Sequence, residues 1–121
     1  MATERGGSLL DELIGDEDDV AIAAATVAEL LVGVELATPS RGEARAAFVE
    51  NLLETVPVEV YDLGVARMHG RLLAHTRQSG RPRGAHDLLI AATALERGRT
   101  VVTSDAAGFE DLPGVSVRTP S

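Results

Sequence analysis

Residues 84–105, GAHDLLIAATALERGRTVVTSD, predict a helix, a helix stop and a strand in direct succession. Apolar side chains recur at the spacing of one helix face, which predicts a helix over residues 86–97. Gly98 favours the end of that helix, and the β-branched run at 100–103 predicts a short buried strand. Asp105 follows this strand directly, so the segment ends by placing a carboxylate beyond a strand.

The rest of the chain repeats this alternation of strands and helices. Strands are predicted at residues 20–24, 58–61 and 115–117, and helices at residues 8–14, 26–38, 40–55 and 63–77. Two helix starts rest on capping-box spacing, Thr26 with Glu29 and Ser40 with Glu43. The alternation predicts an α/β fold in which a small parallel sheet is flanked by helices.

The composition suits one globular domain. The chain has 121 residues, of which 45% are hydrophobic and 2% are aromatic, so the core must consist of aliphatic side chains. With no cysteine, disulfides, thiol nucleophiles and cysteine-based zinc sites are excluded. No apolar run approaches the roughly 20 residues of a membrane span, and the start does not resemble a secretory signal. We therefore expect a soluble cytoplasmic protein.

The charge is distributed unevenly along the chain. A net charge of −8 argues against a general nucleic-acid coat protein, yet residues 61–104 hold seven arginines and three acids. Arg77, Arg81 and Arg83 surround a predicted loop at 79–84. Two interpretations stay open: these arginines bind RNA phosphates, or they are solvated residues that balance an acidic surface.

Three carboxylates are predicted at the carboxyl ends of the strands. Glu29 lies in the first turn of the helix after the first predicted strand, and Asp87 opens the helix before Asp105. Ligands of parallel sheets bind at this end of the strands. Clustered carboxylates favour Mg²⁺ or Mn²⁺, which supports phosphodiester hydrolysis. Each residue also has a structural interpretation: a capping box for Glu29, the helix dipole for Asp87 and a turn for Asp105.

Two segments, 24–33 (AATVAELLVG) and 84–105, resemble the second acidic motif and the C-terminal half of a PIN domain. The resemblance extends over about residues 20–117 and is greatest to the VapC-type toxins of bacterial toxin–antitoxin pairs. It implies a Mg²⁺-dependent endoribonuclease, with Mn²⁺ as a possible substitute, that acts as the toxin of a type II system. Glu29, Asp87 and Asp105 become the catalytic and metal-binding carboxylates. RNA is the implied substrate, and a cognate antitoxin and a second copy of the chain are the implied partners.

The sequence departs from the family pattern in two places. Family members open with a strand that ends in Asp, whereas this chain begins MATERGG, so residues 1–121 are interpreted as a single PIN-like domain that is N-terminally incomplete. The strands at Val20 and Thr100 would then lack a shared neighbour, which exposes their edges. Family members also often carry an acid shortly after the third motif, where this chain has Gly108.

The sequence also bears on three other classes of function. The missing first Asp favours a catalytically inactive PIN-like remnant that binds an antitoxin or a sister subunit. His86–Asp87 is also found in helical metal phosphohydrolases, but His69 and His75 are six residues apart and do not share a helix face as further ligands. Ser104 has no flanking elbow glycines, so a serine nucleophile is disfavoured.

Overall fold

The structure, a computed structural model, describes residues 21–119. Its elements, in chain order, are β1 (Ile22–Ala23), α2 (Ala24–Leu36), α3 (Pro39–Thr55), β2 (Val58–Glu59), α4 (Leu63–Ser79), α5 (Ala85–Arg97), β3 (Val101–Val102), the 3₁₀ helix η1 (Ala106–Phe109) and β4 (Val117–Arg118). The helix predicted at residues 8–14 lies outside the described residues. In the described part, no helix is both long and apolar enough to cross a membrane.

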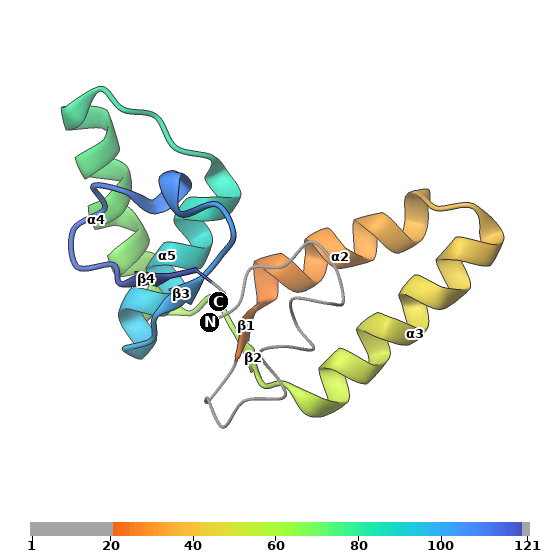
Figure 1. Cartoon of the computed structure of the whole chain (residues 1–121). Helices are drawn as coiled ribbons and strands as arrows, with labels where there is room; N and C mark the ends of the chain where they lie inside the picture. Colours follow the sequence, from red (N-terminus) through yellow and green to blue (C-terminus); the bar gives the residue numbers. More distant parts are fainter. Residues whose placement is uncertain (1–20, 120–121) are drawn as a thin grey trace.

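The four strands form two parallel pairs. β1 pairs with β2 in the register of Ile22 opposite Val58, and β3 pairs with β4 in the register of Val101 opposite Val117. Within residues 21–119, no strand joins the two pairs. Figure 1 shows α4, α5, β3 and β4 gathered on one side, while α2 and α3 form a hairpin that projects from the other. The predicted α/β fold with parallel strands is confirmed, although each strand is shorter than predicted.

Both capping-box predictions are wrong. α2 already begins at Ala24, its N-cap Ala23 makes no side-chain cap bond, and Thr26 lies buried inside the first turn. α3 begins one residue before Ser40, at Pro39, whose fixed φ suits the first helical position. In both cases the helix starts earlier than the polar residue, so that residue's side chain is not used as the cap.

The ends of α4 and α5 follow local rules more closely. The carboxylate of Asp62 accepts a 3.0 Å hydrogen bond from the backbone N–H of Val65, which caps α4. Gly80 and Gly98 end α4 and α5 in the left-handed conformation, with φ of 69° and 64°. The predicted stop at Gly98 is therefore confirmed, and α5 matches its predicted bounds within one residue.

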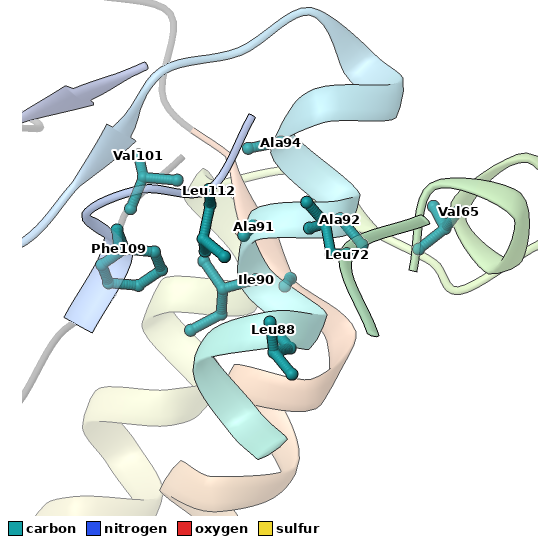
Figure 2. Packing of buried hydrophobic residues seen from close by; sticks show 11 residues of the cluster. Val65, Leu72, Leu88, Ile90, Ala91, Ala92, Ala94, Val101, Phe109 and Leu112 are labelled. Atoms are coloured by element: carbon teal, nitrogen blue, oxygen red, sulfur yellow. The ribbon is translucent and has the colours of Figure 1, made fainter. Parts of the chain in front are cut away.

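The core is built around α5. Figure 2 shows this helix between the side chains of α4 on one side and those of β3 and the η1 region on the other. Alanines on α5 let the neighbouring elements approach closely, and large aliphatic side chains fill the remaining space. The main cluster contains the buried residues Ala23, Val65, Leu72, Leu88, Ile90, Ala91, Ala92, Ala94, Val101, Phe109 and Leu112.

A set of ion pairs joins the end of α5 to the connection between β2 and α4. Arg97 Nε lies 2.7 Å from Glu59 Oε2, and Arg97 NH2 lies 3.1 Å from Asp62 Oδ2. Arg99 NH2 lies 3.2 Å from Glu59 Oε1. The hydrogen bonds that Arg97 donates to Glu59 and Asp62 raise its pKa further above its already high value. This network therefore fixes the C-terminal end of α5 against the β2 side of the fold.

Asp62 gives the fold a predictable pH dependence. The backbone N–H of Val65, followed by the Arg97 side chain, lowers the pKa of Asp62 below its usual value of 3.8. A lowered folded-state pKa means that the stabilisation is present above the unfolded-state pKa and is lost as pH falls through the folded-state value. Asp62→Asn keeps a capping oxygen but removes the charge. We expect the variant to melt below the parent at neutral pH and the difference to vanish in acid. A constant difference across a thermal-unfolding pH series would contradict this assignment.

Candidate active site

One cleft of about 270 Å³ contains all three carboxylates singled out by the sequence. It opens between the first half of α2, the start of α5 and the segment that follows β3. Its lining residues are Thr26, Glu29, Leu30, His86, Asp87, Ile90, Thr103, Ser104, Asp105 and Phe109. Segments that are distant in sequence therefore converge on a single cleft, as the strand order predicted.

Glu29 is presented to the cleft by the second turn of α2. It is the sixth residue of the helix and solvent-exposed, whereas the capping-box interpretation required the third helical position. A backbone-capping role therefore does not explain this glutamate. Glu29 instead presents an accessible carboxylate on the wall of the cleft.

Asp87 and Asp105 are set by local structure on either side of the cleft. Asp87 is the third residue of α5, where the helix dipole favours an anion. Asp105 follows β3, and its backbone N–H donates a 3.0 Å hydrogen bond to Thr103 Oγ1. This turn directs the chain from β3 into η1, and the Asp105 side chain makes no cap bond to that helix. The Asp105 carboxylate is thus not consumed by capping η1.

The backbone of Gly108 lies close to the carboxylates of both aspartates. A Cβ atom placed on Gly108 would lie 2.7 Å from Asp87 Oδ2 and 3.9 Å from Asp105 Oδ2. Both carboxylates therefore border the same small space beside η1. Among residues 21–119, no three His, Asp or Glu side chains are close enough to form a ready-made ion cage. Glu29 lines the same cleft from α2, a different segment from those that carry Asp87 and Asp105.

We expect Gly108→Ala to impair any activity that depends on Asp87. A contact of 2.7 Å is shorter than real Cβ atoms tolerate, so the Asp87 carboxylate must move. Gly70→Ala is the matched control, because Gly70 lies within α4 and a Cβ there meets nothing within 4 Å. The control should gain up to about 1 kcal/mol of stability and keep its activity. Full activity in Gly108→Ala would show that the Asp87 position is not critical.

Two residues of the cleft are not among the three carboxylates. The sequence predicts Thr26 as a helix cap, and it marks His86 only as part of a His-Asp pair. Instead both line the cleft, with Thr26 Oγ1 lying 3.4 Å from His86 Nε2. The two are 60 positions apart. Only their adjacency to acidic motif residues, three before Glu29 and one before Asp87, marked them in the sequence.

None of the three arginines proposed for RNA lines the cleft. Arg77 lies in the last turn of α4 and is exposed. Arg81 forms an exposed ion pair with Asp111, and Arg83 NH2 donates a 2.7 Å hydrogen bond to the carbonyl oxygen of Glu110. These contacts tie the loop before α5 to the segment after η1.

Comparison with known proteins identifies the family of the chain. The model of the PIN domain family matches residues 2–115. Ribonuclease VapC5 of Mycobacterium tuberculosis is 43% identical over 108 residues, covering 87% of this chain and 76% of that protein. The tRNA(fMet)-specific endonuclease VapC of Salmonella typhimurium is 33% identical over 96 residues, covering 79% of this chain and 71% of its own length.

Solved structures give the same result for the fold. The VapBC-5 toxin–antitoxin structure from Mycobacterium tuberculosis matches with a TM-score of 0.74 and 31% identity, covering 90% of this chain and 94% of that one. DNA-bound VapBC from Salmonella typhimurium matches with a TM-score of 0.83 and 28% identity, covering 93% and 85%. With its three carboxylates in one cleft, this chain belongs to the PIN-domain family and groups there with the VapC ribonucleases.

Proposed function

We propose that this chain is an endoribonuclease, the toxin of a type II toxin–antitoxin system, and that it hydrolyses RNA phosphodiester bonds with Mg²⁺ at the cleft of Glu29, Asp87 and Asp105. The observation that carries the proposal is the convergence of these carboxylates, from three separate segments, on one accessible cleft. The curated relatives are named as ribonucleases and endonucleases, which supports the same reaction class.

The residues of the cleft fit a hard divalent cation. Mg²⁺ and Mn²⁺ prefer oxygen ligands, and Mg²⁺ usually keeps several waters while one or two carboxylates and substrate phosphates complete its shell. Asp87 and Asp105, which border one space beside Gly108, suit such a ligand pair. Glu29, which lines the same cleft from α2, would act on the ion or its waters. The cleft volume of about 270 Å³ far exceeds the roughly 10–15 Å³ that one water requires.

The reaction needs a water oxygen to bond to phosphorus while the bond to the leaving ester oxygen breaks. The proton of the attacking water ends in solvent, and the leaving oxygen receives a proton from solvent. When bound, the divalent ion would activate the water and neutralise charge on the phosphoryl group. The chain itself supplies the fixed carboxylates, so the geometry exists before RNA arrives and little reorganisation is needed at the reacting centre.

The direct test is an incubation of the purified chain with a pool of structured RNAs, with Mg²⁺, with Mn²⁺ and with EDTA. We expect internal cleavage with either ion and none with EDTA. A folded chain that leaves RNA intact at millimolar Mg²⁺ would contradict the nuclease proposal and favour an inactive remnant that retains partner binding. Circular dichroism on the same sample establishes that the chain is folded.

An antitoxin is the proposed protein partner, and a second copy of the chain is the proposed subunit partner. The matching solved structures are toxin–antitoxin complexes, which supports the first of these. The projecting hairpin exposes apolar side chains that such a partner would cover, namely Leu31, Val32, Leu36 and Leu53.

The role of Arg81 can be decided by two substitutions with opposite expected effects. If Arg81 binds RNA phosphate, Arg81→Ala should raise KM about 3- to 10-fold. Asp111→Asn should then lower KM, because it frees Arg81 from an exposed ion pair worth about 0.2–1 kcal/mol. Asparagine also tolerates the positive φ of 65° at Asp111. Steady-state cleavage at two salt concentrations measures both effects, and equal losses in the two variants would instead assign the pair a purely structural role.

A further inference from the structure

We propose that Thr26 and His86 form a positioning pair that sets the separation of α2 and α5, and with it the separation of Glu29 and Asp87. Thr26 Oγ1 lies 3.4 Å from His86 Nε2, and both residues line the cleft. Neither belongs to the carboxylate set that holds the ion. The inference rests on the proposed function of the cleft and deepens it by naming residues that act through their neighbours.

Thr26 is buried, and neither Thr26 nor His86 has a capping role that would compete with their contact. Thr26 is only 3% exposed, so its hydroxyl is removed from bulk water and benefits from a protein partner. Neither side chain is used for helix capping, because Ala23 and Gly84 are the N-caps of α2 and α5 and neither helix has a side-chain cap bond. In either neutral tautomer of His86, one member of the pair donates and the other accepts.

Each member of the pair is coupled to one carboxylate by helix geometry. Thr26 precedes Glu29 by three positions on α2, so the two side chains lie on the same helix face. His86 directly precedes Asp87 in the first turn of α5. A contact between Thr26 and His86 therefore fixes the N-terminal ends of the two helices that carry Glu29 and Asp87.

Electrostatics explain why such a link is useful. Glu29 and Asp87 are both acidic side chains in one cleft, so before a cation binds their repulsion favours separation of α2 and α5. A distance of 3.4 Å is long for a hydrogen bond, so its contribution to overall stability is small. Reaction geometry is more sensitive, since a misplacement of about 1 Å can cost about 100-fold in rate.

The test uses one disruptive and one conservative variant at each position. Thr26→Val and His86→Phe keep size but remove the polar atom, whereas Thr26→Ser and His86→Gln keep a polar atom within reach. We expect each disruptive variant to lower kcat about 10-fold at saturating Mg²⁺, the range typical of residues that orient metal ligands. The conservative variants should recover most of the activity. The double variant Thr26→Val/His86→Phe should be no slower than the slower single variant, since both remove one contact.

A second readout separates this inference from the proposed nuclease activity. Mn²⁺ binding is measured by calorimetry on each variant without RNA, and the disruptive variants should bind about 10-fold more weakly while their melting temperatures stay near the parent value. Parent-like Mn²⁺ affinity and kcat in Thr26→Val, or additive losses in the double variant, would overturn the positioning role. If the parent binds Mn²⁺ but does not cut RNA, the nuclease proposal fails. The Mn²⁺ affinities of the variants then still decide whether Thr26 and His86 position the carboxylates. A parent that binds no Mn²⁺ would refute both.

Discussion

Asp87→Asn is expected to reduce Mg²⁺-dependent RNA cleavage by more than about 100-fold, because it removes a charged oxygen ligand from the cleft. Asp87 Oδ2 borders the space beside Gly108 that Asp105 also faces. Asparagine keeps the size of the side chain and a neutral oxygen. The loss should therefore appear in kcat rather than in folding.

Asp87→Asn should also change how strongly Mg²⁺ stabilises the folded chain. A ligand that binds only the folded state raises stability in proportion to the logarithm of its concentration above the dissociation constant. We expect Mg²⁺ to raise the melting temperature of the parent and to have little effect on Asp87→Asn. Glu43→Gln is the control, since Glu43 lies on α3, is exposed and does not line the cleft. Parent-like cleavage in Asp87→Asn would remove Asp87 from the site.

Leu72→Ala should have the largest effect on stability. Leu72 is fully buried in the cluster between α4 and α5, and truncation of such a leucine costs about 2–5 kcal/mol through lost burial and a residual cavity. For a domain of this size the melting temperature should fall by about 10 °C or more. The side chain is remote from the carboxylates in the cleft lining, so activity below the melting transition should persist.

Leu36→Ala is the matched control for this prediction. Leu36 is 82% exposed at the end of α2, and surface substitutions usually change stability by less than about 0.5 kcal/mol. Thermal unfolding of the parent and the two leucine variants in one buffer makes the comparison. Equal destabilisation by Leu72→Ala and Leu36→Ala would contradict the placement of Leu72 in the core. It would mean that burial does not determine how much stability a leucine truncation removes.

The sequence predicted α5 and its stop well because both depend on local information. The apolar spacing of residues 86–97 and the glycine at 98 specify a helix and its end without reference to the rest of the chain. The strands were predicted too long, and the last one lies at residues 117–118 instead of 115–117. Only two residues of each strand pair with the neighbouring strand. The length of this pairing depends on the partner strand rather than on the β-branched content of the sequence.

The carboxylates could be found from the sequence because their positions relative to strands and helix starts bring them to one end of the fold. The Thr26–His86 contact could not be found, since it depends on how α2 packs against α5 across 60 positions. The capping-box spacing at Thr26 gave the wrong role for the same reason. A local rule assigned its hydroxyl to the helix backbone, whereas tertiary packing turned it towards the cleft.

The most direct test of the account is the position of a bound metal ion. Crystals soaked with Mn²⁺ and measured at the manganese absorption edge would locate the ion without reference to activity. We expect an anomalous peak inside the cleft, within coordination distance of Asp87 and Asp105 and beside Gly108. A peak at another site, or an empty cleft at a Mn²⁺ concentration that supports RNA cleavage, would contradict the claim that these carboxylates form the metal centre.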